Sequence, residues 1–232
     1  MKPSGLPYLT IVVLLLPSSL VAQSGEYRLG VFLRSSDRNM QIAPNVGRGS
    51  ATLRGAELLV RNDVAALFAS YSTGEFSATS GIGGDGPVRE ARALVGLGPP
   101  ELTLEGGYYR RARGSSLSEQ SENLIQLGAR STLNLGPSGF VISLAAATFV
   151  RSDSTLGSSN ELRPVGWIAE TGLLYQAPRG LPFYASLGYR YERIRSNRNV
   201  TPVRHEELSA IVFGVGLRFV PRIKEPPPAA TP

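Results

Sequence analysis

Residues 122–135 read ENLIQLGARSTLNL, and apolar and polar side chains alternate along them. The apolar set consists of Ile125, Leu127, Ala129, Leu133 and Leu135. The positions between them are Gln126, Gly128, Arg130, Thr132 and Asn134. Because successive side chains of a β-strand point to opposite faces, this period of two predicts a long strand with one apolar and one polar face.

The same alternation recurs along most of the chain, and no stretch shows a sustained helical period. In residues 207–220, for example, Ile211, Phe213 and Leu217 are separated by Val212, Gly214 and Arg218. The pattern predicts ten strands, at about 25–36, 49–61, 64–75, 87–98, 101–113, 122–135, 139–151, 164–176, 181–195 and 204–220. Glu57 falls out of phase with its segment, which predicts a β-bulge or a misplaced boundary there.

The connections between the predicted strands alternate in length. Four are tight, at 62–63, 99–100, 136–138 and 177–180, whereas five are longer, at 37–48, 76–86, 114–121, 152–163 and 196–203. An antiparallel meander gives this order when all its short turns lie at one end and all its longer loops lie at the other. An even number of strands also places both ends of the meander on the side of the short turns.

Composition and the first residues narrow the class of protein. The chain has 232 residues, and its 24 basic and 18 acidic residues give a formal net charge of +6. The lack of cysteine excludes a disulfide framework, a thiolate metal site and a cysteine nucleophile. Residues 1–22 combine a positive start at Lys2 with an apolar run at 9–16 and the sequence Val21-Ala22-Gln23. This order predicts a secretory signal peptide that is cleaved after Ala22.

With this leader, these strands and these connections, residues 25–220 resemble the small outer-membrane β-barrel proteins of Gram-negative bacteria. The last strand ends Gly214-Val215-Gly216-Leu217-Arg218-Phe219, which is similar to the terminal signal by which such barrels are recognised for assembly. The chain departs from that pattern because a proline-rich segment follows the aromatic residue. We expect residues 221–232 to form a disordered periplasmic tail, since the prolines cannot extend a sheet.

The resemblance implies a ten-stranded antiparallel up-and-down transmembrane β-barrel over residues 23–220, with short periplasmic turns and longer extracellular loops. It implies an outer-membrane location and contacts with outer-membrane lipid, lipopolysaccharide and the barrel-assembly machinery, in a monomer that binds no nucleic acid. Aromatic residues near the segment ends would form interfacial girdles, and they are Tyr108, Trp167, Tyr175, Phe183, Tyr189 and Tyr191. The alternative is a soluble secreted barrel whose apolar faces turn inward around a hydrophobic ligand.

In a membrane barrel the polar face of each strand lines the lumen. The charged residues predicted there are Glu90, Arg92, Glu105, Arg111, Arg130, Glu170, Arg190 and Arg218. Glu105 and Arg92 lie on adjacent strands on either side of the turn at Pro99, and we expect them to pair diagonally. The set has two interpretations. A structural ion-pair network would fill a narrow barrel, which the small number of strands favours, whereas a charged lining would select solutes.

Candidate chemistry is sparse, and we predict no catalytic residue, no cofactor and no metal site. His205 is the only histidine, and its neighbours Glu206 and Glu207 point to opposite faces of a strand, so at most one shares its side. Arginines around the last long loop would attract the phosphates of lipopolysaccharide, and they include Arg193, Arg195, Arg198 and Arg204. The alternative is a solvated loop whose arginines pair in part with Glu192 and Glu206. The leading hypothesis is a non-enzymatic barrel with a structural, surface-interaction or weak small-solute pore role. An outer-membrane hydrolase centred on His205 is the less favoured alternative.

Overall fold

The computed structural model describes residues 25–42, 45–81, 85–114, 120–156, 159–162, 165–177, 181–195 and 204–220. The predicted signal peptide, the predicted tail and Arg198 lie outside these ranges. Within them, nearly every residue belongs to a β-strand. No α-helix in this part of the chain has the length and apolarity needed to cross a bilayer.

The prediction of ten strands is confirmed, with small shifts of the boundaries. The strands of the barrel wall are β1 (Glu26–Ile42), β2 (Asn45–Arg61), β3 (Ala65–Gly81), β4 (Gly86–Leu97), β5 (Thr103–Arg113), β6 (Gln120–Asn134), β7 (Phe140–Leu156), β9 (Val165–Gln176), β10 (Phe183–Arg195) and β11 (Arg204–Phe219). A short additional strand, β8 (Ser159–Leu162), pairs with the end of β7. The single 3-10 turn η3 (Gly136–Ser138) joins β6 to β7 in the described part of the chain.

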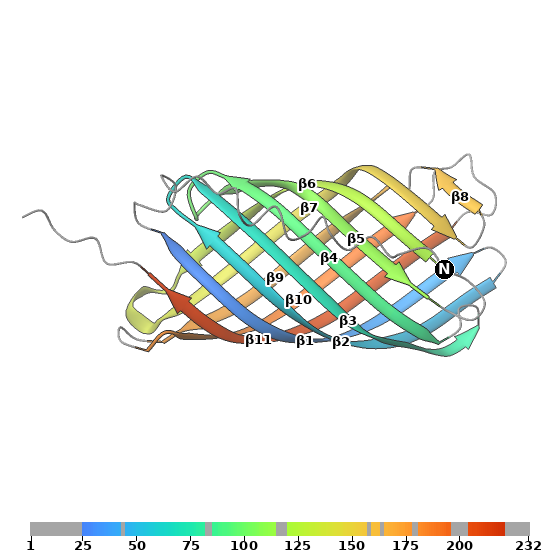
Figure 1. Ribbon diagram of the computed structural model, residues 1–232, viewed down its shortest axis with the longest axis horizontal. Coiled ribbons are helices and arrows are strands. Elements are labelled where there is room, and N and C mark those ends of the chain that lie inside the picture. Colours follow the sequence, from blue (N-terminus) through green and yellow to red (C-terminus); the bar gives the residue numbers. More distant parts are fainter. Residues whose placement is uncertain are drawn as a thin grey trace, which may run out of the picture.

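The antiparallel sheet closes on itself, as Figure 1 shows. Its first and last strands pair along their whole length, from Tyr27 opposite Phe219 to Ile42 opposite Arg204. Closure removes the free edges of the sheet, so the backbone of the wall is hydrogen-bonded without water, as a bilayer requires. β1 begins and β11 ends at the same end as the connections β2–β3, β4–β5, β6–β7 and β9–β10. We call this the turn end and the opposite end the loop end.

Local side-chain chemistry explains the tight connections at the turn end. The side-chain oxygen of Asn62 accepts hydrogen bonds from the backbone N–H groups of Val64 (2.9 Å) and Ala65 (2.7 Å), which forms the turn between β2 and β3. Gly139 follows η3 with a φ of 77°, a left-handed conformation that glycine adopts without a steric penalty. These two turns therefore lie where the sequence predicted them.

Three of the predicted long loops are wrong, because strands continue through them. The segment 152–163 contains the end of β7, to Leu156, and β8, from Ser159 to Leu162. β1 and β2 pair as far as Ile42 opposite Asn45, inside the segment 37–48. β2 and β3 pair as far as Gly47 opposite Gly81, which takes up most of the segment 76–86. The outward side chains here are polar and exposed, as Asp37 and Asn39 are, while the inner face stays buried, as Arg38 and Met40 show, and the strands pair without an apolar outer face. The apolar pattern marks the part of the strand in lipid, and the backbone ladder extends beyond it.

The predicted irregularity at Glu57 is also wrong. Pairing runs through this residue without a shift, with Glu57 opposite Gly30 on β1 and Ser70 on β3. The register of β2 shifts at Arg48/Gly49 instead. Glu57 faces the lumen, and it is the apolar Leu53 and Leu59 on the same face that obscure the alternation.

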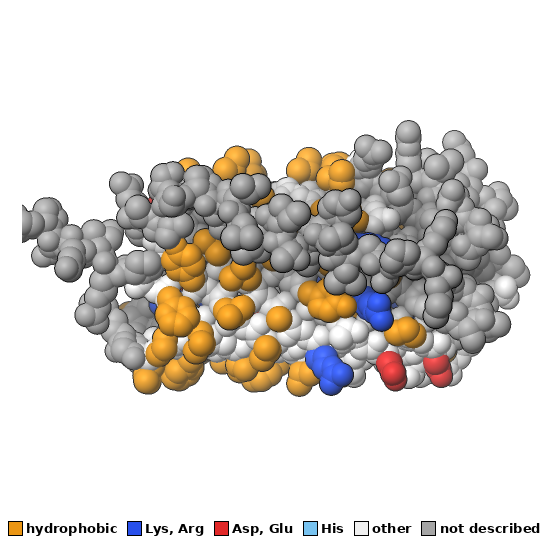
Figure 2. Space-filling model, in the orientation of Figure 1, with side chains coloured by type: hydrophobic (Ala, Val, Ile, Leu, Met, Phe, Trp, Pro, Cys, Tyr) orange, Lys and Arg blue, Asp and Glu red, His pale blue; other side chains and the backbone are white. Residues whose placement is uncertain are grey.

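The outer surface of the barrel is apolar and the inner surface is charged. On β11 the outward side chains Ile211, Phe213, Val215, Leu217 and Phe219 are 41–59% exposed. Figure 2 shows hydrophobic side chains gathered over the part of the wall towards the turn end, with charged side chains nearer the loop end. A soluble barrel would have the reverse arrangement, so the alternative of an inward apolar face is excluded.

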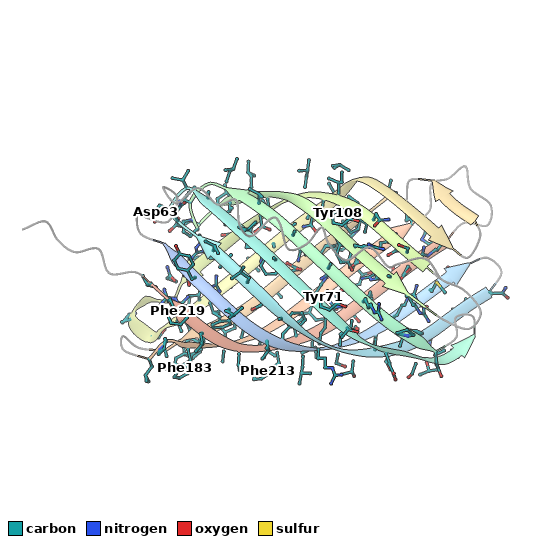
Figure 3. All side chains as sticks on the ribbon, viewed as in Figure 1. Asp63, Tyr71, Tyr108, Phe183, Phe213 and Phe219 are labelled. Carbon is teal, nitrogen blue, oxygen red and sulfur yellow. The ribbon has the colours of Figure 1, made fainter. Side chains whose placement is uncertain are left out.

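The apolar belt has the height of a membrane. The outward residues of β11 from Ile211 to Phe219 span nine positions, which agrees with the ~9–11 residues of a tilted transmembrane strand. In Figure 3, Phe183 and Phe219 lie close to the turn end, whereas Tyr71 and Tyr108 lie farther along the wall. These two aromatic levels match the girdles that flank the apolar band of membrane barrels.

Candidate functional site: a lumen closed by ion pairs

Arginine and glutamate side chains from almost every strand meet inside the barrel. They lie there because each occupies an inward position of its strand, as Arg34 and Arg38 do on β1 and Glu90 and Arg92 do on β4. Three groups follow one another along the barrel axis, and two of them join strands that are not neighbours in the sheet.

The group nearest the loop end, the upper ion cluster, consists of Arg38, Arg111, Arg204, Glu122, Glu192 and Glu206. Arg111 is its centre, because its guanidinium lies 2.9 Å from Glu192 and 3.5 Å from Glu122. Arg204 reaches Glu122 at 2.6 Å and also pairs with Glu206. Glu122 is 0% and Arg204 1% exposed. The pairs β5–β10 and β6–β11 cross the lumen, so this cluster closes it.

The middle ion cluster consists of Arg92, Arg130, Glu105 and Glu170. Arg92 reaches across from β4 to Glu170 on β9 at 2.5 Å. Arg130 lies 2.6 Å from Glu105 and 3.0 Å from Glu170.

The expected diagonal pair Glu105–Arg92 is therefore wrong, and the register explains why. Glu105 is opposite Gly96 on β4, so Arg92 lies four residues away, or about 13 Å at the usual rise of a strand. On the other side Glu105 is opposite Gly128 on β6, which places Arg130 only two residues away. The alternation in the sequence predicts on which face of a strand each residue lies. It does not predict which residues of neighbouring strands lie opposite each other.

The rim cluster lies at the turn end. Glu26 accepts hydrogen bonds from Arg61 at 2.6 Å and from Arg218 at 2.7 Å, and Arg28 lies 3.3 Å away. The predicted lumen residue Arg218 thus pairs at the mouth of the barrel. Glu26, Arg28 and Arg61 were not predicted, although the alternation along β1 and β2 would have placed them inside.

The space between the clusters is only partly filled. Above it, an apolar cluster within the lumen packs Tyr109, Leu124, Phe149, Ile168 and Ile194 together. A cavity of about 250 Å³ remains in the half of the lumen towards the turn end. Its lining runs from Arg61, Asn134 and Gln176 near the turns to Arg34, Tyr109 and Arg190 below the upper ion cluster.

The comparisons with known proteins agree with this geometry. Neither the family models nor the curated protein sequences gave a match. Among solved structures, the outer-membrane protease OmpT from Escherichia coli superposes with a TM-score of 0.52 at 8% identity, over 86% of this chain and 97% of OmpT. The chain has the outer-membrane β-barrel fold. With its apolar belt, it spans the outer membrane.

Other outer-membrane barrels are similar at a lower level. Neisserial surface protein A has a TM-score of 0.43 at 16% identity, over 82% of this chain and 97% of that protein. The attachment invasion locus protein Ail of Yersinia pestis has a TM-score of 0.32 at 12% identity, over 85% of this chain and all (100%) of Ail.

Of the arginines predicted to bind lipopolysaccharide, those that the structure describes lie on different faces of the wall of this outer-membrane barrel. Arg195 is exposed on the outward face of β10, and Arg193 on the same face lies 3.5 Å from Glu207. Arg198 lies outside the described residues. The inclusion of Arg204 is wrong: it occupies an inward position of β11 and belongs to the upper ion cluster. Arg204 is close to the last loop in sequence, but its side chain points into the lumen, whereas those of Arg193 and Arg195 point outward.

Four outward arginines in the described part of the barrel were missed. They are Arg48 and Arg54 on β2, Arg89 on β4 and Arg110 on β5, and all are exposed. Arg54 and Arg89 are both opposite Thr73 on β3, and Arg110 is opposite Ala91, two residues from Arg89. Arg54, Arg89 and Arg110 form one outward row, which we call the arginine row. Each is two residues beyond an outward apolar residue, namely Ala56, Ala91 and Tyr108.

His205 lies on the outward face of β11, opposite Gln41 on β1 and Arg195 on β10. Its neighbour Glu206 points into the lumen. The described part of the chain contains no group of three or more potential metal ligands.

Proposed function

We propose that this protein is a non-enzymatic outer-membrane barrel that does not conduct solutes and acts through its outer surface. The observation that supports this proposal is the upper ion cluster, which fills the cross-section of the lumen with buried, mutually paired side chains. Small barrels of this kind are filled by side chains, whereas open aqueous channels appear at ~16 strands.

The ion pairs are difficult to separate. Each buried charge has exchanged water for a partner on another strand, and removal of one partner from such a pair costs about 3–5 kcal/mol. Arg111 contacts carboxylates from β4, β6, β10 and β11. A solute would have to break several of these contacts together, so the cluster favours a structural role over a selective lining.

The partner proposed for the outer surface is lipopolysaccharide. The arginine row lies at the edge of the apolar belt, where lipid headgroups begin, and Arg193 and Arg195 lie near the loop end of β10. Guanidinium groups bind phosphate through paired, charge-assisted hydrogen bonds. Strands lie about 4.8 Å apart, so the row places Arg54 and Arg89 roughly 10 Å from each other. In this proposal His205 has no catalytic role.

Planar-bilayer recordings test the closed lumen. The purified, folded barrel is expected to insert without producing discrete current steps at moderate voltage, in the presence of a small electrolyte. Insertion is verified separately by protease protection of the membrane-embedded part. Regular steps of constant size from the wild-type protein would overturn the proposal.

A further inference from the structure

The lumen cavity is lined by more positive than negative side chains. Six arginines and four glutamates contribute to its lining. The rim cluster adds Arg218 and Glu26, and the upper ion cluster adds as many arginines as glutamates, so the excess of positive charge remains. An excess of charge inside a protein-lined space is costly unless an ion of opposite sign enters it.

Three buried donors without a partner in the protein lie at the inner end of this cavity. Among the described residues, the hydroxyl of Tyr109 and the Nε–H groups of Arg34 and Arg190 are buried and have no hydrogen-bond acceptor. All three residues line the cavity. Tyr109 is 0% exposed, and the guanidinium of Arg190 lies 5.1 Å from its ring centre.

The carboxylates that face these donors are already engaged elsewhere. Glu90 binds Nη2 of Arg34 at 2.5 Å and Nε of Arg111 at 2.9 Å. Glu192 binds Nη2 of Arg190 at 2.9 Å, and Glu170 lies 3.9 Å from the Nε of Arg190 while it bonds Arg92 and Arg130. Each arginine therefore uses its Nη2 group in a pair with a carboxylate and leaves Nε–H for another acceptor. A buried donor without an acceptor costs about 1–3 kcal/mol.

We propose that the cavity is a binding site for a small oxyanion, a phosphate or carboxylate group, that enters from the periplasmic side. Two guanidinium donors and a phenol O–H suit an acceptor with several oxygens, and they suit it better than a spherical ion. The volume of about 250 Å³ is below that of pockets for drug-sized ligands, which fits a small anion with a few waters. This site does not depend on the outer surface, so it goes beyond the function proposed above.

The test is a calorimetric titration of the folded barrel in a zwitterionic detergent with inorganic phosphate and, separately, with acetate. Chloride at equal ionic strength is the reference. One saturable site is expected for phosphate or acetate, and the tighter anion identifies the preferred class. The melting temperature of the wild-type barrel should rise with the same anion, as mass action requires.

The variant Tyr109→Phe makes the assignment specific. It removes only a hydroxyl that has no partner in the protein, so folding should be preserved, while affinity for the anion should fall about tenfold. The matched control Tyr71→Phe removes the same atom from the outer face of β3 and should leave affinity unchanged. Heats equal to those of chloride, or an affinity of Tyr109→Phe within about twofold of the wild type, would overturn the site. Current steps in a bilayer would contradict only the closed lumen.

Discussion

At the scale of single residues, two glycines allow one tyrosine to cross the inner wall. Tyr184 on β10 extends over Gly216 and Gly30, and its hydroxyl donates a 2.9 Å hydrogen bond to Glu57 on β2. A Cβ atom on Gly30 would lie 2.0 Å from the Tyr184 hydroxyl. The absence of both side chains thus creates the groove in which the ring lies, and the ring joins four strands at the turn end.

Gly30→Ala is therefore expected to lower the free energy of unfolding by about 1–3 kcal/mol, because the ring must leave its position and lose the bond to Glu57. Urea unfolding in lipid bilayers, followed by the fluorescence of Trp167, measures the change. Gly114→Ala is the control, since its Cβ would meet neighbours only at 3.5 Å or more. In a Tyr184→Leu background the cost of Gly30→Ala should largely disappear; an undiminished cost would show that the tyrosine is not its cause.

At the scale of an element, β11 passes through two environments along one face. Its outward side chains are apolar from Phe219 to Ile211 and polar from Ser209 to His205. The strand itself is continuous, with unbroken pairing to β1 and β10 across this change. The backbone hydrogen bonds between strands form both in lipid and in water. The side chains alone therefore determine how deeply the strand lies in the bilayer.

An arginine placed along this face should report the depth. Val215 lies midway along the apolar part, so Val215→Arg is expected to cost about 2–4 kcal/mol of folding free energy in a bilayer, whereas Ser209→Arg should cost less than about 1 kcal/mol. Folding titrations in urea with phospholipid vesicles measure both variants. Equal costs at the two positions would mean that the bilayer does not end between them.

The difference between the side-chain pattern and the backbone pairing also explains which features could be predicted from the sequence. Alternation identified the strands, because lipid demands an apolar residue at every second position, as Ile211 to Phe219 show. It failed for the hairpin that ends at Ile42 and Asn45, where the outward side chains no longer meet lipid and need not be apolar, although the strands continue. It also could not give the pairing of Glu105, because the offset between strands is a property of the closed sheet. The inward direction of Arg204 could be predicted from the alternation along β11, because Arg204 lies an even number of residues from Arg218 on the polar face. Its closeness to the last loop suggested the outer surface instead.

At the scale of the whole molecule, adjacent residues serve opposite surfaces. Arg110 and Arg111 follow one another on β5, yet Arg110 belongs to the outward arginine row and Arg111 is the centre of the upper ion cluster. The wall is one chain thick, so the residues that stabilise the interior and those proposed to bind lipopolysaccharide are separated by a single peptide bond. This geometry permits a test in which each surface is the control for the other.

Arg111→Met should lower the free energy of unfolding by about 3–5 kcal/mol, because it leaves buried carboxylates without their shared partner. Arg110→Met should change it by less than about 0.5 kcal/mol. Conversely, Arg110→Met should reduce the lipopolysaccharide that stays bound through detergent washing, measured as phosphate per barrel, and Arg111→Met should not. If both variants lose stability or both lose lipopolysaccharide to the same extent, the two surfaces do not have the separate roles assigned to them.

The length of the first two strands raises part of the molecule above the membrane. From Ser35, level with the upper edge of the apolar belt, to Ile42, β1 continues for seven residues, which corresponds to about 24 Å along the strand. β11 pairs with β1 over the same stretch, as far as Arg204 opposite Ile42, so this whole part of the barrel wall extends beyond the apolar belt. A molecule that approaches the loop end would therefore meet a hydrogen-bonded wall with polar outward side chains before it met the apolar belt.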